Sequence, residues 1–76
     1  MSDFFVMLLE VHNLQNEVIA INLDKVAEIY SSELLVNGKP GKITTFIYIG
    51  GGGEEVIEDY EKVMNALSDY TSVISL

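Results

Sequence analysis

The sequence predicts an α+β fold: a small antiparallel β-sheet of four to five strands with one C-terminal α-helix. Over the first 50 positions, short segments rich in branched and aromatic residues alternate with clusters of turn residues. After the glycines that follow, apolar residues recur at helical spacing over a longer segment. A chain of 76 residues has the size of one domain, so we expect a single domain over residues 1–76.

The first predicted strand covers residues 4–11 and is apolar on both faces. One face carries Phe5, Met7, Leu9 and Val11, and the other carries Phe4, Val6 and Leu8. This pattern is typical of a strand that is buried on both sides, and one small helix cannot cover both faces of a sheet. We therefore expect Phe4, Val6 and Leu8 to contact a second copy of the chain, which predicts a homo-oligomer.

Residues 17–22 predict a second strand, which pairs antiparallel with the first across the turn-forming residues 12–16. A brief turn is expected at residues 23–25. Residues 26–31 are compatible with a half-buried strand, although residues 24–30 also fit two helical turns. The strand is the better interpretation because the segment is short and β-branched.

A surface hairpin or excursion is predicted between Ser32 and Lys42, because the Asn37-Gly38 and Pro40-Gly41 pairs favour tight turns. Residues 43–49 follow, with the cleanest alternation of side chains in the chain, and predict its clearest strand.

Four glycines at positions 50–53 come next. They predict a flexible turn between two strands, since glycine tolerates positive φ. Their alternative role is a bare backbone surface, at Gly51 and Gly52, against which a ligand or partner packs. A phosphate-binding loop is disfavoured because acidic residues, instead of Lys or Arg, follow the glycines.

Residues 54–70 allow two divisions. The spacing of apolar residues fits one long helix over the whole segment. It also fits a short strand at residues 55–58, followed by Asp59 as N-cap and a helix to about Asp69. The final residues, 71–76, are apolar enough to dock or to form a strand.

The charge of the chain limits its partners. Twelve Asp and Glu residues against four lysines give a net charge of -8, and there is no arginine. Nucleic acid is therefore a poor partner, because phosphate binding needs clustered Lys and Arg. An acidic surface suits solubility or a host protein with a basic surface, and we expect contacts from Glu58, Asp59, Glu61 and Asp69 on the acidic helix.

Chemistry at a catalytic or metal centre is not predicted. The chain has no cysteine, and its single histidine, His12, leaves no Cys/His cluster and is expected to be a polar turn residue. The acidic residues Glu54, Glu55, Glu58, Asp59 and Glu61 are expected to stabilise a helix N-terminus through the macrodipole. We expect no enzyme activity, cofactor or metal.

The longest apolar run, residues 4–9, is too short to span a membrane. It also lacks the basic and small-residue features of a signal peptide. We therefore expect a cytoplasmic protein without a membrane partner.

Two stretches, residues 19–29 and 56–64, resemble the small FlbD-like (SwrD-type) proteins linked to bacterial flagella, together with their uncharacterised phage and gut-bacterial relatives. The resemblance covers residues 5–67. It implies that the glycines close a hairpin and that Val56 and Ile57 end the sheet before the helix begins. The segment 31–42 is longer than the turn of that family, and the basic residues of the flagellar members are largely missing. The resemblance implies no catalytic residues.

Two functions are compatible with these features. The first is an oligomeric, non-enzymatic protein-interaction module, such as a small regulator or inhibitor of phage or bacterial origin. The alternative is an oligomer that sequesters a nucleotide signal, held by Lys39, Lys42 and the glycines, with Tyr30 or Tyr48 from neighbouring subunits.

Overall fold

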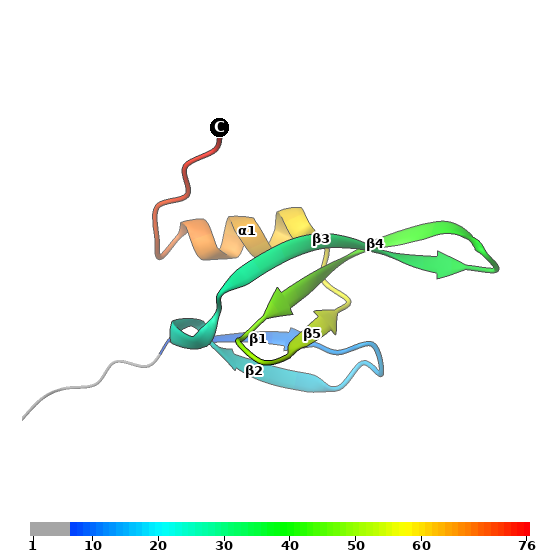
Figure 1. The fold of residues 1–76 in the computed structure, drawn as a ribbon, viewed down its shortest axis with the longest axis horizontal. Coiled ribbons are helices and arrows are strands. Elements are labelled where there is room, and N and C mark those ends of the chain that lie inside the picture. The colour runs from blue at the N-terminus through cyan, green and yellow to red at the C-terminus, as the bar shows by residue number, and fades with distance from the viewer. Residues whose placement is uncertain (1–6) are drawn as a thin grey trace, which may run out of the picture.

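The computed structural model describes residues 7–76 and contains five strands, one 3-10 turn and one α-helix (Figure 1). The elements are β1 (Leu8–His12), β2 (Val18–Asn22), η1 (Leu23–Lys25), β3 (Glu28–Val36), β4 (Lys39–Tyr48), β5 (Gly53–Val56) and α1 (Tyr60–Ser68). The predicted α+β class is confirmed. The strands, however, divide between two antiparallel sheets, β1–β2 and β3–β4–β5, instead of forming one.

The first sheet is a hairpin in which Leu8 pairs with Asn22 and His12 pairs with Val18. Its turn is held by Asn13, whose side-chain oxygen accepts hydrogen bonds from the backbone N–H groups of Gln15 and Glu17 at 3.0 and 2.9 Å. The predicted pairing is confirmed. β1 ends at His12, one residue later than expected, while Phe4 and Val6 lie outside the described residues.

The second sheet is built around a long β3–β4 hairpin, whose chain reverses at Asn37 (φ 54°) and Gly38 (φ 75°). The strands predicted at residues 26–31 and 43–49 are confirmed over residues 28–31, in β3, and 43–48, in β4, while residues 26, 27 and 49 lie outside them. The predicted excursion between them is the outer half of this same hairpin. We call residues 33–43 the arm: each of them is exposed, and in Figure 1 the arm extends away from the rest of the fold.

The Pro40-Gly41 pair lies inside β4, so the prediction of a second tight turn there was wrong. The pairing passes from Leu34 opposite Lys42 to Leu35 opposite Pro40, which leaves Gly41 as the extra residue of a bulge. A Cβ atom on Gly41 would lie 2.5 Å from Cγ2 of Val36. Glycine is therefore needed here for close packing across the arm, not for a turn.

The glycine run forms the turn between β4 and β5, as predicted. Gly50 and Gly51 have φ values of 72° and 80°, and the N–H of Ile49 donates to the carbonyl of Gly52 at 2.9 Å. β5 then pairs with β4, from Val56 opposite Thr45 to Gly53 opposite Tyr48.

The helix begins after Asp59, whose side chain accepts a hydrogen bond from the backbone N–H of Lys62 at 2.7 Å. The division into a strand, an N-cap and a short helix is therefore confirmed, although the strand is at residues 53–56 and not at the predicted 55–58. One helix over residues 54–70 is ruled out because residues 53–56 pair with β4. Residues 71–76 form no strand, and Val73, Ile74 and Leu76 are exposed.

Asp59→Ala should lower the free energy of unfolding by about 0.5 to 2 kcal/mol, because an N-cap side chain satisfies a backbone N–H that the first helical turn leaves free. Urea melts followed by circular dichroism measure this. Glu54→Gln is the matched control, since Glu54 is exposed on β5 and makes no cap. A larger loss of stability in the control would contradict the role of Asp59.

The core lies where the two sheets face each other. Val11, Ile21, Ile47 and Val56 form its buried cluster, one residue from each of β1, β2, β4 and β5. Val63 and Leu67 are the buried side chains of α1. Among residues 7–76, no helix has the length and apolar character needed to cross a membrane.

Candidate functional site

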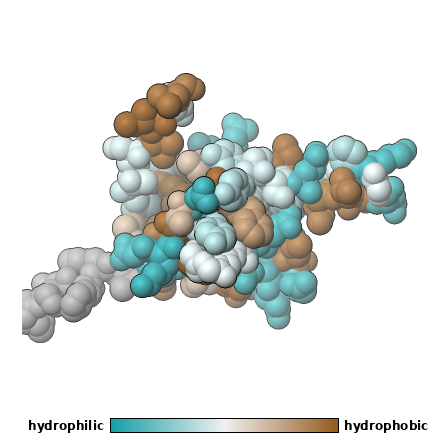
Figure 2. Space-filling model, viewed as in Figure 1, coloured by the Kyte–Doolittle hydropathy of each residue, from teal (hydrophilic) through white to brown (hydrophobic). Residues whose placement is uncertain are grey.

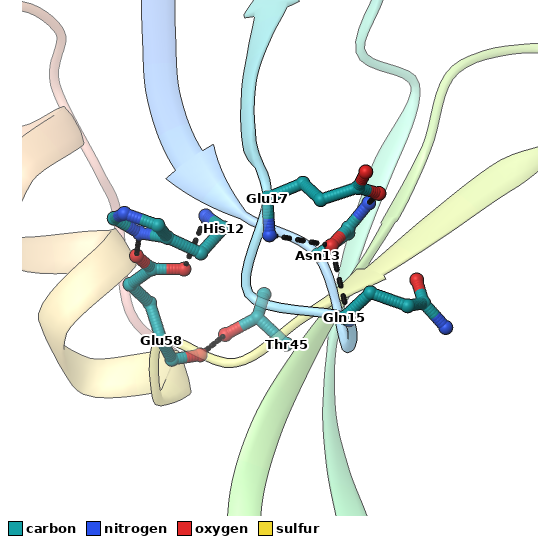
Figure 3. Close-up of polar contacts among 6 residues, drawn as sticks. All are labelled: His12, Asn13, Gln15, Glu17, Thr45 and Glu58. Atoms are coloured by element: carbon teal, nitrogen blue, oxygen red, sulfur yellow. Dashed lines mark hydrogen bonds and ion pairs between the residues drawn. The ribbon is translucent and has the colours of Figure 1, made fainter.

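A pair of polar residues joins the end of β1 to the segment that leads into α1. The backbone N–H of His12 donates to Glu58 Oε1 at 3.0 Å, and the His12 ring donates from Nδ1 to Glu58 Oε2 at 2.7 Å (Figure 3). The hydroxyl of Thr45 donates to the Glu58 carbonyl at 2.8 Å. Glu58 thus connects β1, β4 and the start of the helix.

The electrostatics of Glu58 follow from these contacts. Its side chain is only 15% exposed, and burial alone would raise the pKa of the carboxyl group. Hydrogen bonds from the ring and backbone of His12 outweigh burial, so the pKa of Glu58 is lowered. Glu58 is therefore an ionised structural anchor.

Two predictions about these polar residues were wrong. His12 is the last residue of β1, not a turn residue, and it is bonded to a residue 46 positions away. Glu54 and Glu55 lie on β5 and do not flank the helix, and Glu55 accepts a hydrogen bond from the Thr44 hydroxyl at 2.7 Å. Only Asp59 and Glu61 occupy the cap and the first turn of α1.

An open groove of about 660 Å³ lies beside the His12–Glu58 pair. Its lining brings together three of the predicted contact residues, Lys42, Glu58 and Asp59. His12 and Lys62 also line it. The carboxylates of Glu58 and Asp59 are engaged by hydrogen bonds within the protein. Lys42 and Lys62 are therefore the charged side chains of the groove that have no ion pair among residues 7–76.

The other predicted contact residues lie apart from this groove. Lys39 is beside the tip of the arm, whereas Gly51 and Gly52 form the turn at the opposite end of β4. Glu61 is exposed in the first turn of α1, and Leu8 is 60% exposed on β1. Within one chain, the structure therefore does not bring Lys39 or Lys42 to the glycines.

A cluster of aromatic side chains occupies one face of the second sheet. Tyr30 on β3 lies opposite Phe46 on β4, with ring centroids 6.4 Å apart. Tyr48 is two residues along β4 and therefore shares this face. We call Tyr30, Phe46 and Tyr48 the aromatic cluster.

Gly53 is the residue that allows the aromatic cluster to pack onto β5. A Cβ atom at this position would collide with the Phe46 ring, so the ring lies directly over the glycine backbone. Gly53 has no positive φ. Its role is close approach, which the prediction of a simple flexible turn did not include.

Carboxylates lie at both ends of the aromatic cluster. Glu28 faces Tyr48 across the β3–β4 pair, and Glu55 faces Phe46 across the β4–β5 pair. The pKa of Tyr30 is raised, chiefly by the neighbouring carboxylate of Glu28. The sequence showed how side chains alternate along each strand. It did not show the register between strands, on which the aromatic cluster depends.

The arm displays apolar side chains to solvent. Four apolar side chains of the arm are exposed: Leu34, Leu35, Val36 and Ile43. The exposed fraction of Leu35 is 62%. Figure 2 shows hydrophobic surface on the arm and on the C-terminal tail, at a distance from each other. The arm is thus a shaped hairpin whose apolar residues lack cover within residues 7–76.

No family model matches this chain, and neither the curated proteins nor the solved structures gave a match. The resemblance to the FlbD-like family stays a prediction.

Proposed function

We propose that this protein is a non-enzymatic protein-interaction module that acts as a homo-oligomer, with the arm as the contact between copies. In this role it serves as a small regulator or inhibitor, of phage or bacterial origin and cytoplasmic, that engages a host protein with a basic surface. The observation that carries the proposal is the exposed apolar arm.

The arm has the features of a specified interface. Asn37 and Gly38 fix its turn with positive φ values, and Gly41 is required where Val36 packs across the hairpin. A two-stranded ribbon without further packing is marginal in water. A shaped ribbon that exposes apolar residues on this scale is typical of a surface that another chain covers.

A second copy is the occupant that the chain itself supplies. β3 is an edge strand of its sheet, and its outer part, Leu34–Leu35–Val36, carries no charge. Natural edge strands are usually protected from pairing by charges or by cover. Two arms that meet around a two-fold axis would protect both edges, and each Leu, Val or Ile side chain buried there contributes about 1.5 to 3 kcal/mol.

Light scattering at micromolar concentration tests the proposal. The wild-type protein should have at least twice the monomer mass of 8.4 kDa. Leu35→Glu should reduce the mass to that of the monomer, because it places a charge in the apolar contact. Val18→Glu is the matched control: it makes the same kind of change at an exposed position of β2, outside the arm, and should leave the mass unchanged. A monomeric wild-type protein would overturn the proposal.

A second candidate function is capture of a small nucleotide. One observation favours it: Lys42 and Lys62, two of the four lysines, line the same groove. Neither forms an ion pair within residues 7–76. Native mass spectrometry reports the oligomer and any retained nucleotide together. A nucleotide that is lost in Lys42→Ala but kept in Lys25→Ala would favour this function over the first.

A further inference from the structure

We propose that the aromatic cluster, Tyr30, Phe46 and Tyr48, with the carboxylates of Glu28 and Glu55, is a binding site for an arginine side chain of a partner protein. This inference rests on the proposed function as a protein-interaction module. It adds the surface and the chemistry of the group that the surface recognises.

The rings supply the first part of such a site. An aromatic face attracts a cation placed over it, and the planar guanidinium group of arginine also stacks on the ring. Tyr30 is 47% exposed, while Phe46 and Tyr48 are half-buried, so the cluster presents ring surface and is still fixed in place. The Phe46 ring is held on the backbone of Gly53 and beside the Tyr30 ring.

The carboxylates supply the second part. Glu28 is exposed, shares a face of β3 with Tyr30 two residues along, and lies opposite Tyr48 at one end of the cluster. Glu55 lies beside Phe46 and is held by the hydroxyl of Thr44 through Oε2. A carboxylate beside an aromatic ring matches arginine, which can donate several hydrogen bonds and stack at the same time.

Charge on the rest of the molecule points to the same partner. The net charge is -8, which favours the approach of a basic surface. The nearest lysine on β4, Lys42, is four residues beyond Phe46 and lines the groove with His12. The chain has no arginine, so the group that fills this site has to come from a different protein and not from a second copy.

Binding of a fluorescein-labelled Gly-Arg-Gly-Arg-Gly peptide, measured by fluorescence anisotropy, tests the site. Tyr30→Leu should weaken binding by about 2- to 30-fold, the range expected from loss of a cation–aromatic contact. Tyr30→Phe keeps the ring and should retain most of the binding. Circular dichroism of each variant establishes that the fold is kept.

Charge controls separate this site from general attraction to an acidic protein. Glu28→Gln removes a carboxylate at the aromatic cluster, whereas Glu33→Gln removes one from the same strand on its other face. Glu28→Gln should weaken binding more than Glu33→Gln does. Equal losses, or no effect of Tyr30→Leu, would overturn the inference and assign the binding to overall charge.

Two further outcomes keep this inference distinct from the proposed function. A protein that forms oligomers but does not bind the peptide would overturn the arginine site and leave the oligomeric module standing. A monomer that binds the peptide with the expected dependence on Tyr30 would support the site and overturn the arm contact. Amide shifts in an NMR titration should centre on β3, β4 and β5, and shifts confined to α1 would contradict the site.

Discussion

Ile47→Ala should lower the free energy of unfolding by about 2 to 5 kcal/mol. Ile47 is 0% exposed and belongs to the cluster where the two sheets meet, so its truncation leaves a cavity that neighbours on four strands would have to fill. A domain of 76 residues has a total stability of roughly 4 to 11 kcal/mol, so this one change removes a large share of it.

Thermal and urea unfolding, at a fixed protein concentration, measure the effect of Ile47→Ala. The matched control is Ile74→Ala, the same substitution at a position that is 86% exposed and outside every strand and helix. We expect the control to change stability by less than about 0.5 kcal/mol. Similar losses in the two variants would mean that Ile47 does not occupy the centre of the core.

Glu58→Ala should be the second most damaging change, at about 1.5 to 3 kcal/mol at neutral pH, the range for hydrogen bonds to a charged group. The substitution removes both acceptors of His12 and leaves its backbone N–H without the protein partner it has in the native structure. Glu58→Gln keeps one acceptor oxygen in the same place, and we expect it to lose less stability.

The contribution of Glu58 should also depend on pH. Its pKa is lowered in the folded protein from the ordinary value of 4.5, so folding favours the ionised carboxylate. The stabilisation is therefore complete above about pH 4.5 and is lost as the pH falls through the lower pKa of the folded state. The stability difference between wild type and Glu58→Gln should shrink over that acidic range. A difference that grows as the pH falls would contradict an ionised Glu58.

Features set by local chemistry could be predicted from the sequence. Alternation located most of each strand, the glycines located the β4–β5 turn, and Asp59 was recognisable as a cap because its side chain acts only three residues away. The arm was partly predicted for the same reason. The Asn37-Gly38 turn was readable, whereas the role of Gly41 depends on Val36 in the opposite strand.

Features set by distant contacts could not be predicted. The division into two sheets and the aromatic cluster both depend on strand register, which alternation alone does not determine. The His12–Glu58 pair joins residues 46 positions apart, and neither residue carries a local signal of the other. The sequence predicted instead that Glu58 is one of several acidic residues that stabilise a helix N-terminus, because other carboxylates adjoin it in the sequence.

The division into two sheets also bears on the order in which the chain folds. Within residues 7–76, every strand pair joins strands that are consecutive in the sequence, so each hairpin closes a short loop at small entropic cost. The contacts of the β1–β2 hairpin with residues 56–58 are different, because they close a loop of more than 40 residues. We infer that the β3–β4–β5 sheet and α1 can form first and that the β1–β2 hairpin joins them late. Its contacts join residues far apart in the sequence, so their formation should set the overall folding rate.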